Sequence, residues 1–195
     1  ATTVTLAGGG AGTFYTASDC TGSTSTITIA SSASTQSYYF KDNTAQGLTH
    51  TADSGSLTQG TRAVTVNADA INKLVYTVGP SPVTAGACST VFTVQRQDTY
   101  NNPASPASAT TVTLAGGGAG TFYTASNCTG STSTITIASS ASTQSYYFQD
   151  NTAQGLTHTA DSGSLTQGTR AVTIDPAAIN KLVYTVGPSP VTAGA

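Results

Sequence analysis

Cysteine is the residue type in this sequence that is best placed to form a covalent bond. The chain contains Cys20, Cys88 and Cys128, and Cys20 and Cys128 stand at equivalent positions of two nearly identical stretches. Continuing the repeat predicts a further cysteine one residue past Ala195. Each period then carries two cysteines, as a disulfide framework would. Two pairings compete, namely Cys88 with Cys128 and Cys88 with Cys20.

We favour the pair Cys88–Cys128, because both residues fall within one domain of the division given below. Cys20 would then pair with a cysteine outside the chain. Closing a loop of about 40 residues would stabilise a domain by about 4 kcal/mol in the chain-entropy model. Buried free thiols and a zinc site are the alternatives. Persistent disulfides form outside the reducing cytosol, so we expect an extracellular or cell-surface location.

Histidine and aspartate suggest a second kind of chemistry. His50 and Asp53 lie among many serines, and the second copy supplies His158 and Asp161. A Ser-His-Asp triad also needs an oriented base and an oxyanion hole, and no strand–turn–helix nucleophile elbow is present. The alternation around His158 places it on a strand face that we expect to be exposed. We therefore predict no catalytic residue, no cofactor and no enzymatic activity.

Lysine could form an intramolecular isopeptide bond with asparagine, a reaction that needs a nearby acid. The chain has no Glu, and the only lysine common to both copies is Lys73, repeated as Lys181. Lys41 becomes Gln149 in the second copy, so a bond made by Lys41 would not be general. Isopeptide crosslinking is thus a minor alternative.

Calcium is the metal that the carboxylates would suit, because oxygen ligands at linkers can bind it. The candidate ligands are Asp69, Asp98 and Asp175. Asp69 is replaced by Ala177 in the second copy, however, and no acidic loop clusters these side chains. We therefore predict no metal site.

The elements that must position these residues are set by a long internal repeat. Ala1 begins a stretch that returns at Ala109, an offset of 108 residues, and the match continues to Ala195. A period of this length indicates one small domain per repeat rather than a helical solenoid. Six aligned positions differ between the copies: Asp19/Asn127, Lys41/Gln149, Val66/Ile174, Asn67/Asp175, Ala68/Pro176 and Asp69/Ala177.

Composition excludes several classes of protein. Charged residues make up 7% of the chain, against about 25% in ordinary globular proteins, and the net charge is −2. No basic patch could neutralise phosphates, so we expect no nucleic-acid partner. No apolar run approaches the roughly 20 residues that span a bilayer, so we expect no membrane insertion of this segment. The missing initiator Met and signal peptide indicate an internal piece of a longer protein.

Short alternating segments predict an all-β fold. In Lys73–Val78, for example, Leu74 and Tyr76 share one face, and period-two alternation implies one buried and one solvated face. The glycine run Gly116–Gly120 can only be a turn or bulge. The predicted strands in one period are Lys73–Val78, Thr90–Gln97, Thr110–Ala115, Gly120–Thr124, Ser133–Ala138, Gln144–Gln149, Leu156–Ala160 and Thr169–Ile174.

The predicted domain boundaries do not coincide with the ends of the chain. Residues 174–180 interrupt the alternation and include a proline, which suits a linker. We therefore place one complete domain at 72–179. Residues 1–71 would be the C-terminal part of a preceding repeat, and 180–195 the first strand of the next.

Two segments resemble bacterial immunoglobulin-like repeats of the invasin/intimin kind. Asn72–Ala87 is similar to the opening of such repeats, and Val91–Pro103 resembles their second-strand signature, a valine-rich strand that runs into an Asp-x-x-Asn-Asn-Pro turn. Ala171–Ile174 fits the closing strand. The resemblance implies tandem immunoglobulin-like β-sandwich domains with Greek-key antiparallel sheets. It also implies a spacer or display module of a surface adhesin or fibre, without chemistry of its own.

The function that we predict is therefore structural: a spacer or filament-forming unit of a secreted bacterial surface fibre or giant adhesin. Tyr39 and Tyr147 leave the core face of their strands and are possible assembly contacts. Thr-rich, uncharged strands are little protected against edge-to-edge pairing, so copies of the same protein are the expected partners, laterally or end to end. The alternative is a module that binds a glycan or a protein on a host or neighbouring cell.

Overall fold

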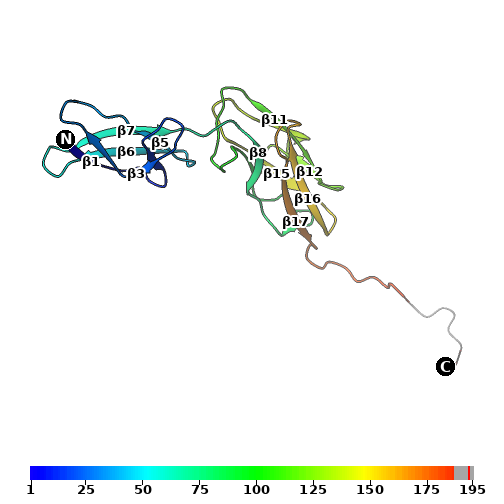
Figure 1. Ribbon diagram of the computed structural model, residues 1–195. Coiled ribbons are helices and arrows are strands. Elements are labelled where there is room, and N and C mark those ends of the chain that lie inside the picture. The colour runs from blue at the N-terminus through cyan, green and yellow to red at the C-terminus, as the bar shows by residue number, and fades with distance from the viewer. Residues whose placement is uncertain (187–192, 194–195) are drawn as a thin grey trace.

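The computed structural model describes residues 1–186 and 193, and these residues form strands and loops without a helix. The strands build two β-sandwiches joined by one connection (Figure 1). The all-β sandwich prediction is confirmed. The division of the chain at residues 72 and 179 stays a prediction, although the two hydrophobic cores lie on either side of residue 72.

The first sandwich consists of a four-stranded and a three-stranded sheet. The four-stranded sheet has the order β4-β1-β6-β7 and the three-stranded sheet has the order β3-β2-β5. All pairings within it are antiparallel. The strands are β1 (Thr2–Ala7), β2 (Thr13–Tyr15), β3 (Ser23–Thr24), β4 (Thr26–Ile29), β5 (Tyr39–Lys41), β6 (Gln46–Asp53) and β7 (Gly60–Val66).

The second sandwich consists of two five-stranded sheets, with the orders β13-β12-β15-β10-β8 and β14-β11-β16-β17-β9. β9 pairs in parallel with β17, and an isolated parallel bridge joins Lys73 to Thr166. The strands are β8 (Lys73–Val78), β9 (Val83–Thr84), β10 (Phe92–Gln97), β11 (Thr110–Ala115), β12 (Thr121–Tyr123), β13 (Ser131–Thr132), β14 (Thr134–Ile137), β15 (Thr143–Gln149), β16 (Gln154–Asp161) and β17 (Gly168–Asp175).

Alternation along the strands fills the core of the second sandwich. Phe92 and Val94 of β10 point inward together with Tyr146 and Phe148 of β15, and all four side chains are fully buried. Phe92 stacks on Tyr146 with the ring planes 6° apart. Burial of large apolar side chains is the main favourable term in folding, so this layer stabilises the sandwich.

The glycine run of each copy forms a tight turn against the facing strand. Gly116 has a φ of 77°, and a Cβ built there would lie 1.8 Å from the backbone oxygen of Thr157. Gly8 is in the same position relative to Thr49. Only glycine fits so close an approach, which explains why this turn contains no side chain at that point.

The chain leaves the second sandwich after β17. Residues 176–186 run away from the sandwich (Figure 1), and the apolar side chains Leu182, Tyr184 and Val186 are almost fully exposed. The prediction that residues 180–195 are the first strand of another repeat lies partly outside the described residues.

Candidate functional site

The densest polar network of the described residues lies in the turn that follows β10. Asp98 is fully buried, and its carboxylate accepts hydrogen bonds from the backbone N–H groups of Tyr100 (2.8 Å), Asn102 (2.9 Å) and Asp69 (3.0 Å). The side-chain Nδ2 of Asn102 donates a fourth, at 2.8 Å. Asn101 has a φ of 74°, a left-handed conformation that asparagine tolerates. This turn is therefore rigidly closed around one carboxylate.

Asn102 extends the network into the first sandwich. Its Nδ2 donates to the backbone oxygen of Asn43 at 2.8 Å, and its Oδ1 accepts from the backbone N–H of Ala45 at 2.9 Å. Asn43 and Ala45 lie in the loop between β5 and β6. A single buried amide thus uses both its donor and its acceptor side to join two sandwiches, and Asp98 holds that amide in place.

The charge of Asp98 is favoured by this environment. Burial raises the pKa of the carboxyl, but the hydrogen bonds from Asn102, Asp69 and Tyr100 outweigh burial, so the pKa lies below its usual value. The ionised carboxylate makes the bonds charge-assisted, and such bonds are stronger than neutral ones. The carboxylate that holds the junction is therefore ionised at neutral pH.

The calcium ligands considered from the sequence do not come together. Asp69 contributes its backbone N–H to Asp98, while its own Oδ1 accepts from Ala70 at 2.7 Å. Asp175 ends β17 of the second sandwich, where its backbone carbonyl accepts from the N–H of Ala85. Within residues 1–186 and 193, no three His, Cys or Asp side chains are grouped as metal ligands.

The prediction that His158 is exposed is wrong. Its exposed fraction is 0%, and that of His50 is 3%. His158 shares a strand face with Leu156 and Ala160, so period-two alternation directs it into the core, where Phe122 and Phe148 contact its ring edge to face.

The histidines are therefore structural members of the aromatic core. The Nδ1 of His158 lies 3.0 Å from the hydroxyl of Tyr146, and that of His50 lies 3.2 Å from the hydroxyl of Tyr38. Burial lowers the pKa of His158 to about 4, so it is neutral at pH 7. Among the described residues neither histidine is hydrogen-bonded to a carboxylate or serine.

The aspartates of the imagined triad serve turns instead. The Oδ1 of Asp53 accepts the backbone N–H of Gly55 at 2.8 Å, and Asp161 accepts that of Gly163 at 2.8 Å. These side chains cap a tight loop and do not orient an imidazole.

Arg96 is a structural core residue that is not among the predicted site residues. Its side chain is fully buried at the end of β10. Its Nη1 donates to the carbonyl of Ser108 (3.0 Å) and to the hydroxyl of Thr110 (2.9 Å), and its Nη2 donates to the carbonyls of Ala138 (3.0 Å) and Ala141. The guanidinium thereby fastens β10 to the start of β11 and to the loop between β14 and β15. Alternation from Phe92 and Val94 would have placed this residue inward.

Cys88 and Cys128 are joined by a disulfide with 5.7 Å between their Cα atoms. The bond attaches the segment before β10 to the loop between β12 and β13. Cys20, the equivalent of Cys128, is a partly exposed free thiol.

The two tyrosines proposed as assembly contacts differ in exposure. Tyr39 is 40% exposed on β5, whereas Tyr147 on β15 is partly buried. Each pairs across its sheet with another tyrosine, Tyr15 or Tyr123. Their role in assembly stays a prediction.

The lysine of the isopeptide hypothesis lies beside an asparagine. The Nζ of Lys73 donates a hydrogen bond to the Oδ1 of Asn101, which is exposed. This contact ties the start of β8 to the turn of Asp98. Lys41 ends β5, and Lys181 lies in the exposed segment after β17.

Comparisons with solved structures gave matches of low similarity. No family model and no curated protein matches. A glycosyl hydrolase family 2 member from Bacteroides cellulosilyticus is 12% identical with a TM-score of 0.48, over 89% of this chain and 21% of that one. Domains 1–6 of the surface layer protein SbsC are 17% identical with a TM-score of 0.39, over 88% of this chain and 21% of that one. The chain spans about a fifth of each of these structures.

Residues 1–186 and 193 contain no helix that is long and apolar enough to cross a membrane.

Proposed function

We propose that this chain is a structural repeat segment, a spacer or filament-forming unit, of a secreted bacterial surface fibre or giant adhesin. The observation that carries the proposal is the junction of Asn102 with Asn43 and Ala45. It makes consecutive sandwiches a continuous hydrogen-bonded body, which is the property that a load-bearing stalk requires.

The junction is built so that it can recur. Asn43 and Ala45 contribute only backbone groups to Asn102, and the equivalent loop of the second sandwich, with Asn151 and Ala153, has the same sequence. The second sandwich therefore presents at its far end the same receiving loop that the first presents to Asn102. A following repeat with the same turn would dock in the same way.

Other features agree with a mechanical role outside the cell. The disulfide closes a loop in the second sandwich and suits an oxidising compartment. The polar groups that catalysis would use, His158 and Asp161 among them, are engaged in the core or in turns. The immunoglobulin-like repeats of invasin/intimin type that the sequence resembles are themselves spacer modules, and we assign this chain to the same non-catalytic role.

The experiment that tests the proposal measures whether the two sandwiches tumble as one body. In NMR relaxation, the wild-type chain should show one rotational correlation time for both sandwiches. Asn102→Ala removes both bonds to the first sandwich and should give two shorter correlation times. Asn43→Ala is the matched control, because only the backbone of Asn43 takes part, and it should behave as the wild type. Independent tumbling in the wild type would contradict a stiff spacer.

A further inference from the structure

Each copy of the repeat carries a pair of tyrosines on the outer face of one sheet. In the second sandwich, Tyr123 of β12 is the direct cross-strand partner of Tyr147 of β15. In the first sandwich, Tyr15 of β2 and Tyr39 of β5 are partners at the equivalent place. Directly opposite side chains on one face of a sheet have Cβ atoms about 5 Å apart, so each pair forms one aromatic patch. The six differences between the copies leave both pairs unchanged.

The second sandwich shows why the pair faces outward. Phe122 on β12 and Phe148 on β15 are buried in the core. Period-two alternation therefore directs their neighbours Tyr123 and Tyr147 to the opposite face, where both are partly exposed. Within residues 1–186 and 193, the two hydroxyls make no hydrogen bond and the two rings pack on no other aromatic ring, whereas the core residue Tyr146 does both. The rings and hydroxyls of the pair can therefore contact a ligand.

The rest of this sheet face is polar and almost uncharged. The hydroxyl of Ser145 on β15 lies 3.0 Å from that of Thr93 on β10. The next outward residue on β10 is Gln95, whose Oε1 accepts a hydrogen bond from the Nε2 of Gln97 at 2.8 Å. Of the residues that point this way in the five strands, only Lys73 is charged, and it lies at the edge of the sheet on β8. The face thus combines an aromatic patch with neutral hydrogen-bonding groups.

A sugar ring has the chemistry that fits this face. A pyranose presents C–H groups on its flat sides and hydroxyls around its rim, so it can pack on a tyrosine ring while its hydroxyls bond to amide and hydroxyl side chains. A charged polymer has no such match, because an anion would need cations and a basic peptide would need carboxylates on this face. A second copy of this chain fits less well, since the centre of a protein interface is apolar and Gln95 and Gln97 occupy this one.

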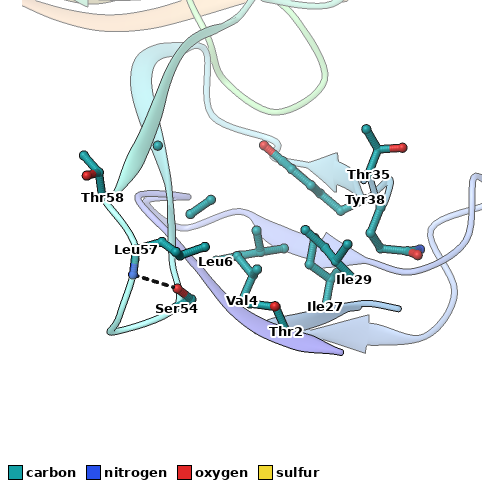
Figure 2. Close-up of a pocket in the computed structure, with 13 residues that line it drawn as sticks. Thr2, Val4, Leu6, Ile27, Ile29, Thr35, Tyr38, Ser54, Leu57 and Thr58 are labelled. Atoms are coloured by element: carbon teal, nitrogen blue, oxygen red, sulfur yellow. Dashed lines mark hydrogen bonds between the residues drawn. The ribbon is translucent and has the colours of Figure 1, made fainter. Parts of the chain in front are cut away.

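The apolar cavity of the first sandwich does not have this combination of groups. It has a volume of about 540 Å³ and is bordered by β1, β4 and β6, and Val4, Leu6, Ile27 and Ile29 point into it (Figure 2). A sugar placed there would leave hydroxyls without partners, and an unpartnered polar group in apolar surroundings costs free energy. The tyrosine face is therefore the better match for a neutral, hydrated ligand.

We propose that the outer face of this sheet, centred on Tyr123 and Tyr147, binds a neutral polysaccharide. The site goes beyond the structural role proposed above, because it gives a stalk a ligand along its length, and it does not depend on the junction of the two sandwiches. Each repeat carries one tyrosine pair, so one polysaccharide chain can contact several repeats, and weak sites then add up to a much tighter attachment. One site alone should bind with a dissociation constant in the millimolar range, since its hydrogen bonds replace bonds to water.

The test is affinity electrophoresis of the full chain in native gels that contain glucomannan, xyloglucan or dextran, three neutral polysaccharides. The wild-type protein should migrate more slowly in at least one of these gels than in a gel without polysaccharide. A variant with all four paired tyrosines replaced by alanine should bind at least about tenfold more weakly, because the aromatic packing surface is lost. Tyr100→Ala is the matched control: it removes a tyrosine that is 45% exposed in the turn after β10, and it should migrate as the wild type does.

A second measurement does not require the variant to fold. Amide chemical shifts of the wild-type chain, recorded with a trisaccharide of the polysaccharide that slows it, should change along β12, β15 and β10. Normal migration in all three gels would overturn the proposal, and so would chemical-shift changes confined to other surfaces. If the tyrosine variant instead lost a concentration-dependent self-association, and no gel slowed the wild type, the face would be an assembly contact and not a saccharide site.

Discussion

The first sandwich and residues 109–175 of the second have nearly the same sequence but differ in burial and in strand length. Val64 and Val66 of β7 are partly exposed, whereas the equivalent Val172 and Ile174 are buried. The conservative change from valine to isoleucine does not explain this difference. What differs is that β10 and β8 extend one sheet of the second copy and β9 extends the other.

The comparison teaches that these residues specify a fold that they do not complete alone. The aromatic cluster around the histidine forms in both copies, with Phe40 and His50 4.4 Å apart between ring centroids and Phe148 and His158 also 4.4 Å apart. The strand that pairs with β10 in the second copy, β15, contains Thr143–Gln149, whereas its equivalent in the first copy, β5, contains only Tyr39–Lys41. The aromatic cluster around the histidine thus forms without β8 and β10. The longer form of β15 is found only where β8 and β10 are present.

Removal of the disulfide should have the largest effect on the stability of the second sandwich relative to the first. Replacing both Cys88 and Cys128 by Ser should lower the free energy of unfolding of the second sandwich by about 4 kcal/mol, because the unfolded chain regains the entropy of an open loop. Cys20→Ser is the matched control and should change nothing, because Cys20 is a free thiol. Denaturant unfolding followed by amide exchange of each sandwich checks this. A loss below about 1 kcal/mol in the free energy of unfolding would contradict a major stabilising role of the disulfide.

The second-largest effect should come from truncating a core isoleucine, which should destabilise the two sandwiches by different amounts. Ile137 is fully buried and Ile29 is partly exposed. Ile137→Ala should cost about 3 kcal/mol through lost burial and a residual cavity, and Ile29→Ala about 1 kcal/mol, because solvent already reaches that site. Equilibrium unfolding of the two variants gives the two values. Similar losses would mean that Ile29 is as well packed in solution as Ile137.

Acid should destabilise the second sandwich through His158. Its pKa is about 4 in the folded state against about 6.5 when unfolded, so its contribution is complete above pH 6.5 and is lost as the pH falls toward 4. At pH 5 the loss should be about 2 kcal/mol relative to pH 7. His158→Gln should flatten the stability profile in this window. A profile that keeps its slope in the variant would assign the acid sensitivity to another group.

The smallest expected effect concerns one hydroxyl. Tyr146→Phe removes a buried hydroxyl that is 3.0 Å from His158 and donates to Tyr76, and should cost about 1 kcal/mol. Tyr38→Phe should cost less than half as much, because Tyr38 is partly exposed and has only the His50 contact. Thermal unfolding can order the two variants. The reverse order would show that the first sandwich is the better packed of the two.

Alternation predicted the strands of the sandwich well where residue type and period agreed. Lys73–Val78 and Thr110–Ala115 have the predicted bounds. His158 stands at an inward position of its strand, although the alternation around it was read as an exposed face, and Arg96, which is not among the predicted site residues, also stands at an inward position. The core accepts them because His158 is neutral and because four oxygen acceptors surround the guanidinium of Arg96.

The junction could be predicted only in part. The segment Asp98–Asn102 was identifiable as a turn, since Asp and Asn bond readily to nearby backbone groups. Its contact with Asn43 and Ala45 spans 57 to 59 residues, and no local pattern encodes a partner at that separation. The short strands β9 and β13 were missed for a related reason: two residues are too few to show a period.

The bond between Cys88 and Cys128 also sets how far a repeat can lengthen when its ends are pulled apart. The two residues are 40 positions apart in the sequence, and their Cα atoms stay 5.7 Å apart even when every strand between them has separated. An extended chain gains about 3.3 Å per residue, so the bond withholds about 130 Å of contour length from each rupture event. A reducing agent would release this contour length. Each unfolding event in a tether of such repeats would then extend the tether further than it does with the disulfide intact.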